Sequence, residues 1–184
     1  YVDVTFGGGG HYREILKKLG QKGQLFAFDQ DKDALQNDLK DPRFTLIPEN
    51  FCHIKRFLRT HGVKKVDGIL ADLGVSSHQF NEAERGFSTR FDAELDMRMD
   101  RNSLLNAKTV VNEYGERELE NIFFNYGELR NAKQIAKKII EARQKKELSA
   151  SFDLIKAVET LLPKGLENKI LAQIYQAIRI EVNQ

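Results

Sequence analysis

Four consecutive glycines, Gly7 to Gly10, separate a strand-like segment from a helix-like segment near the start of this 184-residue chain. A glycine in regular structure costs roughly 0.5–1 kcal/mol relative to alanine, so such a run needs a physical reason. Glycines between the first parallel strand and its helix allow the backbone to approach a nucleotide-like ligand closely. The run therefore indicates a binding site for a ligand of that kind.

The residues beside the glycines match neither of the common phosphate-binding motifs. A P-loop requires G-x-x-x-x-G-K-[ST], but His11 and Tyr12 stand where its lysine and hydroxyl residue would open the helix. A dinucleotide-binding turn requires G-x-G-x-x-G. Gly7 and Gly9 fit that pattern, whereas Tyr12 takes the place of the third glycine. A nicotinamide-dependent dehydrogenase is therefore disfavoured, and only tight NAD binding would revive that interpretation.

Two aspartates follow strand-like segments at positions that suit a ligand with a ribose. Asp29 lies 22 residues after Gly7, close to the ~20-residue offset at which a carboxylate binds ribose hydroxyls. Asp72 ends the fourth strand-like segment, and ligands of open α/β sheets lie beyond such carboxyl ends. S-adenosylmethionine (SAM) has an adenosine ribose but no pyrophosphate. We expect Asp29 to bind the ribose and Asp72 to face the reacting end; the alternatives are a solvated strand-end acid and a loop cap.

The first part of the chain alternates between strand and helix signals. Strands are expected at residues 1–6, 23–30, 43–51 and 65–75, and helices at residues 11–20, 31–40 and 53–62. This alternation is typical of a parallel α/β sheet. The fourth strand is apolar enough to be covered on both faces.

Residues 74–103 have no sustained period, and from Leu104 the pattern is helical to the end. Amphipathic helices are expected at residues 115–127, 131–143, 151–162 and 167–183. The second presents one apolar face, made of Ala132, Ile135, Ala136, Ile139 and Ile140. Ser151 is a suitable N-cap for the third. Residues 130–146 hold seven Lys/Arg and one acidic residue, a basic stripe that suits either nucleic-acid phosphates or a solvated face.

The composition restricts the class of protein. The formal net charge is +2, and Cys52 is the only cysteine, so no internal disulfide can form and the reducing cytoplasm is the expected location. Next to Phe51, Cys52 is expected to be a small buried hydrophobe. No apolar run reaches the roughly 20 residues that span a bilayer, and the four histidines lack the spacing of a metal site. Because the chain begins and ends inside expected elements, we expect it to be part of a longer protein.

Six segments carry a family resemblance when they are taken together. In chain order they are YVDVTFGGGGH, FAFDQD, VDGILADLGVSS, ERGFS, LDMRMD and YGELRNAKQIAKKI. They resemble the bacterial 16S ribosomal RNA (cytosine-N4) methyltransferase family, also known as RsmH or MraW. The glycine run alone is a weak signal, but DLGVSS followed by ERGFS and LDMRMD is very specific. The resemblance extends over essentially the whole chain.

The resemblance implies an α/β fold: an incomplete Rossmann-like SAM-dependent methyltransferase sheet with strand order 3-2-1-4, the remaining strands missing, and an inserted all-helical domain. It implies a SAM-binding domain at residues 1–103 and a helical, RNA-binding domain at residues 104–184. The implied cofactor contacts are Gly9, Gly10, His11, Asp29, Phe51, Asp72 and Gln79. There are two departures: His78 stands where the family usually has proline, and NKILAQ stands where it usually has H-P-A-T-R.

The activity implied by the resemblance is methyl transfer from SAM to the exocyclic N4 amine of a cytosine in 16S ribosomal RNA of the small subunit. Catalytic residues are not identified, because DLGV stands where many amino-methyltransferases have [DNS]-P-P-[YF]. Phe80, Phe87 and Phe91 would either stack on a flipped base or anchor their loop. The alternative is a catalytically incomplete fragment that binds SAM or RNA without turnover, since missing strands would leave the fourth strand as a sheet edge.

Overall fold

The computed structural model describes residues 1–31, 34, 36 and 40–183. The chain divides into two compact units, Tyr1–Ser77 and His78–Gln184, and each is described by itself. The helix expected at residues 31–40 lies largely outside the described residues.

The first unit is built on a parallel sheet. Its strands are β1 (Val2–Asp3), β2 (Leu25–Phe28), β3 (Phe44–Ile47) and β4 (Ile69–Leu70). All the pairings are parallel, and the strand order is β3-β2-β1-β4. The predicted α/β class and the predicted 3-2-1-4 order are therefore confirmed.

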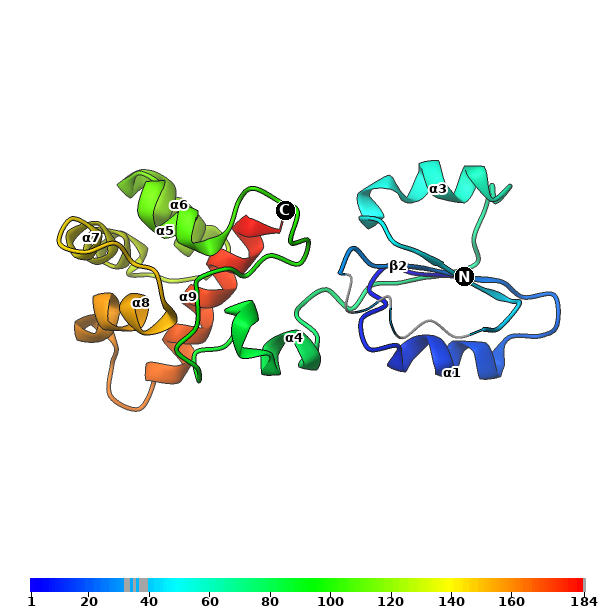
Figure 1. The fold of residues 1–184 in the computed structure, drawn as a ribbon, viewed down its shortest axis with the longest axis horizontal. Helices are drawn as coiled ribbons and strands as arrows, with labels where there is room; N and C mark the ends of the chain where they lie inside the picture. The colour runs from blue at the N-terminus through cyan, green and yellow to red at the C-terminus, as the bar shows by residue number, and fades with distance from the viewer. Residues whose placement is uncertain (32–33, 35, 37–39, 184) are drawn as a thin grey trace. The chain divides into compact units, whose positions relative to one another are not determined.

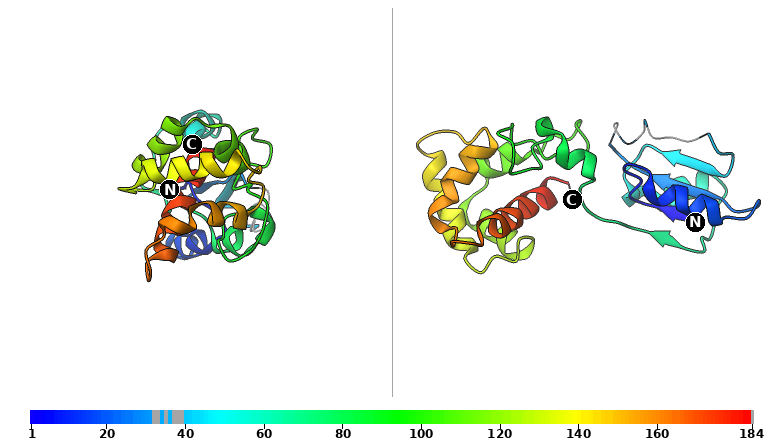
Figure 2. Two further views of the ribbon diagram at one scale, coloured as in Figure 1. Left: turned by 90° about the vertical axis from the view of Figure 1, so that its left-hand side faces the viewer. Right: turned by 90° about the horizontal axis from the view of Figure 1, so that it is seen from below.

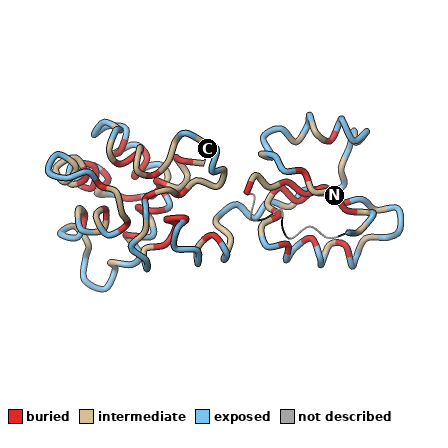
Figure 3. The backbone as a smooth tube through the Cα atoms, viewed as in Figure 1, coloured by how far each residue is buried: buried red, intermediate tan, exposed pale blue. Residues whose placement is uncertain are grey.

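Helices cover both faces of this sheet. Helix α1 (Gly10–Lys18) lies on one face, and the short η1 (Phe51–His53) leads into α3 (Ile54–Thr60) on the other (Figures 1 and 2). Successive residues of β2 point to opposite faces, as a strand requires. Leu25 and Ala27 pack with Leu16 of α1, whereas Phe26 and Phe28 pack with Leu58 of α3. The buried residues accordingly follow the strands and the helix faces turned toward them (Figure 3).

The fourth strand differs from its prediction. β4 pairs with β1 alone within the described part of the chain, and it stands at the end of the strand order. Ile69 is 59% exposed, so the prediction that both faces of this strand are covered is wrong for the described residues. The apolar sequence suits a central strand, but burial requires neighbours that a terminal position does not provide.

The second unit is helical. Its elements are α4 (Ser77–Asn81), η2 (Ala83–Arg85), α5 (Ala107–Glu113), α6 (Glu116–Asn125), α7 (Ala132–Arg143), α8 (Ser151–Val158), η3 (Glu159–Leu161) and α9 (Glu167–Val182). Helix α6 packs against α7 and α9, and α9, which is red in Figures 1 and 2, also packs against α5. Among the described residues, no helix has the length and apolar character needed to cross a membrane.

The apolar face predicted for α7 is confirmed. Ala132, Ile135, Ala136 and Ile139 are buried, because residues three and four apart share one side of a helix, whereas Ile140, the fifth residue of the predicted face, is only partly buried. The predicted cap of α8 is wrong: Ser151 is its first helical residue and is buried. Asp153 Oδ2 instead accepts from the backbone N–H groups of Ser149 and Ala150, each at 3.2 Å.

The irregular segment after α4 is held to the helices by specific contacts. Glu94 forms a β-bridge with Ala150, and the Asn183 side chain at the end of α9 bonds Met97 and Met99. Residues 78–103 thus pack with the helical unit. The domain boundary at residue 103 stays a prediction.

Candidate functional site

The glycine turn joins β1 to α1 and has an unusual backbone. Gly7 and Gly9 have φ values of 50° and 75°, in the left-handed region that favours glycine. A Cβ atom at Gly9 would overlap the Tyr12 ring, whereas one at Gly8 or Gly10 would meet no atom within 4 Å. Gly9 is therefore needed by the fold itself. Gly8 and Gly10 leave the space beside the turn open.

The Tyr12 ring fills the space behind the turn. It is fully buried, and its centroid lies 4.9 Å from the rings of both Phe6 and Phe44. In a dinucleotide-binding fold a third glycine at this position allows close packing of helix on sheet. The aromatic cluster thus replaces that packing and explains how the chain tolerates Tyr12 there.

Asp29 lies at the carboxyl end of β2 and contacts the turn directly. Its Oδ2 accepts from Gly7 N at 2.7 Å, and its Oδ1 accepts from Asp31 N at 2.9 Å. Burial raises the pKa of the Asp29 carboxyl, although the two backbone bonds oppose that shift. Each carboxylate oxygen has two lone pairs, so Asp29 retains acceptor capacity for hydroxyl groups of a ligand.

Asp72 follows β4, and its backbone is tied to β1. The side chain is exposed, and Asp72 N donates to Thr5 Oγ1 at 2.8 Å. Thr5 is in turn held by Asp3, whose Oδ1 accepts from Thr5 N at 3.0 Å and from Thr5 Oγ1 at 3.3 Å. The two predicted aspartates therefore flank the carboxyl end of the same central strand.

Asp3 is a further acidic residue of the candidate site, and the sequence did not single it out. Its side chain is fully buried, and no donor among the described residues reaches Oδ2. Burial raises the pKa of Asp3, the bonds from Thr5 oppose the shift, His11 opposes it further, and Asp72 adds to it. The available signal was an acid inside an apolar strand, since a buried aspartate without a counter-charge is costly.

Three carboxylates thus stand at the carboxyl ends of three adjacent strands: Asp3 on β1, Asp29 after β2 and Asp72 after β4. Such a group favours a ligand with positive charge and hydroxyl donors. The described residues contain no group of three His, Cys, Asp or Glu side chains arranged to hold a metal ion.

Phe51 lies beyond the carboxyl end of β3 and is 42% exposed. Asn50 orders this turn, because its Oδ1 accepts from Cys52 N at 2.9 Å and its Nδ2 donates to Gln30 Oε1 at 3.0 Å. The aromatic ring is therefore on a turn joined to the end of β2. Cys52 is exposed, so its predicted burial is wrong. The exposure of Cys52 follows from its place in the 3₁₀ turn and not from its apolar neighbour Phe51.

The remaining predicted contacts divide between the two units. His11 is exposed on the first turn of α1, next to the glycines. Gln79 is buried in α4 of the second unit, and its contact with a cofactor stays a prediction.

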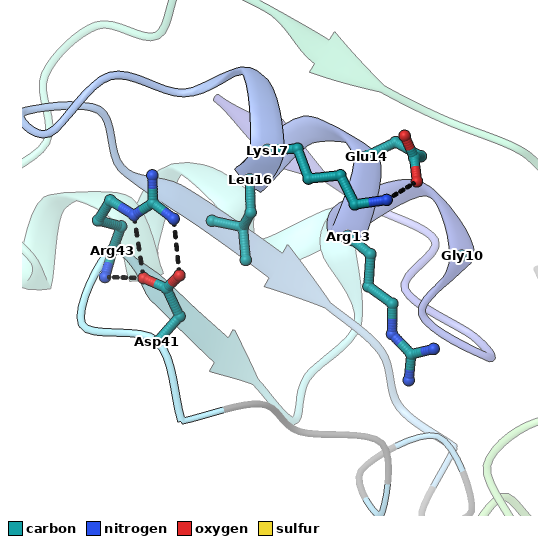
Figure 4. Close-up of a pocket in the computed structure, with 7 residues that line it drawn as sticks. All are labelled: Gly10, Arg13, Glu14, Leu16, Lys17, Asp41 and Arg43. Atoms are coloured by element: carbon teal, nitrogen blue, oxygen red, sulfur yellow. Dashed lines mark hydrogen bonds and ion pairs between the residues drawn. The ribbon is translucent and has the colours of Figure 1, made fainter.

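A shallow pocket of about 530 Å³ lies along α1 (Figure 4). Of the predicted site residues it includes Gly10 alone. Its wall carries two ion pairs, Arg43–Asp41 at 2.7 Å and Lys17–Glu14 at 2.6 Å. Arg13 also lines the pocket and belongs to neither pair, so the lining carries a net positive charge and suits the cationic groups of a ligand less well than the acidic strand ends.

The basic residues of the stripe at residues 130–146 differ in the contacts that they make with the rest of the protein. Arg143 donates to the carbonyls of Val111 and Tyr114 and so has a structural role. Two further cations form ion pairs, Lys138 with Glu141 and Lys146 with Asp153. The others are exposed: Arg130, Lys133, Lys137 and Lys145.

The three phenylalanines of the loop also differ in their burial. Phe87 is buried and anchors its loop, whereas Phe91 is 39% exposed. Phe80 is partly buried, with the Arg90 guanidinium 5.0 Å from the centre of its ring.

A parallel sheet with a glycine turn and acidic strand ends defines a ligand-binding domain of the nucleotide-binding type. The model of the MraW methylase family matches residues 1–184, and the chain belongs to that family.

The chain is also similar to curated proteins named ribosomal RNA small subunit methyltransferase H. It is 66% identical to the one from Flavobacterium johnsoniae, 63% to that from Christiangramia forsetii and 50% to that from Bacteroides thetaiotaomicron. Each match includes the whole of this chain and 61%, 61% and 60% of the respective relative. The chain therefore spans about three fifths of the length of these relatives.

Proposed function

We propose that this protein is a SAM-dependent methyltransferase that modifies the exocyclic N4 amine of a cytosine in 16S ribosomal RNA. The observation that carries the proposal is the arrangement of Asp3, Asp29 and Asp72 around an open glycine turn. Membership of the MraW methylase family and the names of the relatives support it.

The residues present fit the chemistry of SAM. The cofactor has two cationic groups, an ammonium and a sulfonium, together with two ribose hydroxyls. Asp29 would accept the hydroxyls, and the ammonium would approach the exposed carboxylate of Asp72, while the buried Asp3 at the end of the adjacent strand β1 would add negative charge. Gly9, Gly10 and His11 would border the methionine arm, and Phe51 would contact the adenine. When bound, SAM supplies a methyl group activated by the positive sulfur.

The chain must also hold the acceptor amine. The lone pair of a cytosine amine is delocalised into the ring, so the protein has to bring the nitrogen to near-attack distance and accept a hydrogen bond from its proton. We assign Asp72 to binding of the cofactor. We assign no residue to holding the cytosine or to accepting the proton of its amine.

RNA would be bound in part by electrostatic attraction. The exposed cations of the stripe are available to phosphates, because the ion pairs that the described residues of this stripe form involve Lys138 and Lys146 instead. These exposed cations are Arg130, Lys133, Lys137 and Lys145. The exposed Phe91 is the loop aromatic best suited to stack on a base. Since 16S RNA is assembled in the cytoplasm of bacteria, that is where we propose the protein acts.

Calorimetric titration with SAM tests the proposed cofactor. We expect wild-type protein to bind, Asp29→Ala to bind at least tenfold more weakly, and Asp67→Ala to bind like wild type. Asp67 is a matched control because it is an exposed aspartate of the same unit, before β4. An absence of binding by wild type, or equal binding by Asp29→Ala, would refute the proposal.

The second candidate is a unit that binds SAM or RNA without turnover. The exposed edge at Ile69 favours it, because a methyltransferase sheet is expected to continue there. Methylation of undermethylated small-subunit RNA by the 184-residue chain separates the two candidates. Product formation would exclude the second one.

A further inference from the structure

The hydrogen bonding between β1 and β4 changes at its carboxyl end. Val2 N donates to Gly68 O at 3.0 Å, and Val4 N donates to Leu70 O at 2.9 Å, as in a regular parallel ladder. Continuing the same register would pair Asp72 N with the carbonyl of Val4. The structure instead directs Asp72 N to the hydroxyl of Thr5 at 2.8 Å.

The orientation of the Thr5 hydroxyl is determined by Asp3. Asp3 Oδ1 accepts from the Thr5 hydroxyl at 3.3 Å, so the hydroxyl hydrogen points to that oxygen. A lone pair of the hydroxyl is then free to accept from Asp72 N, and this contact is the shorter of the two. The backbone N–H of Thr5 donates to the same Asp3 oxygen at 3.0 Å, which holds Thr5 in a local turn.

A second side-chain bond stands on the opposite side of β1. There Asp29 Oδ2 accepts from Gly7 N at 2.7 Å, which ties the end of β2 to the glycine turn. The two neighbours of β1 are thus attached to its carboxyl end by side chains, Asp29 on one side and Thr5 on the other. Asp29 is a predicted cofactor residue, but Thr5 has no role in the proposal so far.

We infer that Thr5 is a positioning residue: its hydroxyl fixes the backbone at Asp72 and so determines where the Asp72 carboxylate stands at the cofactor site. The cofactor part of this inference rests on the proposed function. The positioning part does not, because the hydrogen bond belongs to the protein alone.

The test compares Thr5→Val, which keeps the shape but lacks the hydroxyl, with Thr5→Ser, which keeps the hydroxyl. Thr60→Val is the matched control, since Thr60 Oγ1 donates to the carbonyls of Arg56 and Phe57 in its own helix α3. Amide hydrogen exchange at Asp72 is measured first without SAM. We expect 3- to 10-fold faster exchange in Thr5→Val, the range that follows from losing one hydrogen bond, and wild-type exchange in the other two variants.

SAM affinity is then measured by calorimetry, with thermal unfolding midpoints as the check on folding. We expect Thr5→Val to bind SAM 3- to 10-fold more weakly while it still unfolds cooperatively well above the temperature of the titration, and Thr5→Ser to restore the affinity. Unchanged exchange at Asp72 in Thr5→Val would overturn the positioning role. Faster exchange with wild-type affinity would overturn its relevance to the cofactor. If wild type bound no SAM, the proposed function would fail while the exchange result would still decide the role of Thr5.

Discussion

The carboxyl end of β1 in the first unit and the segment after η2 in the second unit use polar residues in opposite ways. At β1, Asp3 and Asp29 are held without an ion pair to a cation in the described residues, and burial raises both of their pKa values. In the second unit, the Arg98 guanidinium pairs with Asp96 and donates to the carbonyls of Arg101 and Ser103.

This difference distinguishes a candidate ligand-binding site, at the carboxyl end of β1, from a structural scaffold, the segment after η2. A buried carboxylate without a counter-charge costs stability, and such costs are typical of functional sites. Charges that are paired locally and bonded to backbone carbonyls instead stabilise a loop. ERGFS and LDMRMD, the most family-specific motifs, therefore act mainly as scaffold in this structure: Met97 N donates to Arg85 O, and the Arg85 guanidinium donates to Arg98 O.

The largest expected effect on stability is that of Gly86→Ala, a substitution in the scaffold segment after η2. Gly86 has φ 68°, and a Cβ there would overlap the carbonyl oxygen of Glu94. We expect a loss of about 3 kcal/mol of unfolding free energy, from the left-handed backbone together with the overlap. Gly165→Ala is the control: Gly165 has φ 82° but open space around it, so we expect only about 1 kcal/mol. Equal losses in urea denaturation would contradict the interlocking of the two motifs.

Asn183→Ala is expected to have the next largest effect. The Asn183 amide accepts from Met99 N at 2.6 Å and donates to Met97 O at 2.7 Å, which holds Met97 at a φ of 57°. Its loss should lower the unfolding free energy by about 2 kcal/mol, because two backbone groups lose their partner. The exposed Asn168 provides the control, and Asn168→Ala should change stability by less than about 0.5 kcal/mol.

Gly8→Ala is expected to change ligand affinity and not stability, in contrast to the two preceding substitutions. A Cβ at Gly8 meets no atom of the protein, so we expect stability within about 0.5 kcal/mol of wild type. SAM affinity should fall about tenfold, because the new methyl group occupies the space proposed for the ligand. Gly20→Ala, also in open space but at the end of α1, should leave both quantities unchanged. Wild-type affinity in Gly8→Ala would remove the turn from the proposed site.

Asp3→Asn tests the cost of the buried carboxylate through pH. The pKa of Asp3 is raised in the folded state, so the folded protein holds this proton more tightly than the unfolded chain does. Wild-type stability therefore falls as pH rises from about 3.8 through the folded pKa. The stability of Asp3→Asn minus that of wild type should accordingly rise over this window and then level off.

Asp41→Asn should show the opposite sign in the same denaturation series. Its partner Arg43 lowers the pKa of Asp41, so wild type gains stability as pH rises through the folded pKa toward 3.8. The stability difference for Asp41→Asn should therefore fall over that lower window. Differences of the same sign for the two variants would contradict the contrast between a buried carboxylate without a counter-charge and one paired with a guanidinium.

The smallest effect on stability is expected for single lysines of α7. Lys137→Ala should leave the unfolding free energy within about 0.5 kcal/mol of wild type. If Lys137 contacts a phosphate, the variant should also show a weaker salt dependence of RNA binding. The slope of the logarithm of the binding constant against the logarithm of the salt concentration should become less steep by about one unit. Lys138→Ala is the comparison, because Lys138 already pairs with Glu141 at 2.8 Å and should change the slope less.

The sequence by itself determined the alternation of strands and helices, the glycine turn, the two aspartates beside it and the apolar face of α7. These features depend on local periodicity and on residue types at fixed offsets, which the backbone geometry of strands and helices imposes directly. The tertiary structure alone decided the exposure of Ile69, the burial of Asp3 and the bond from Asp72 to Thr5, 67 residues away in the chain. Such contacts are set by the register and the order of strands that are distant in sequence, and no local pattern of residues encodes either of them.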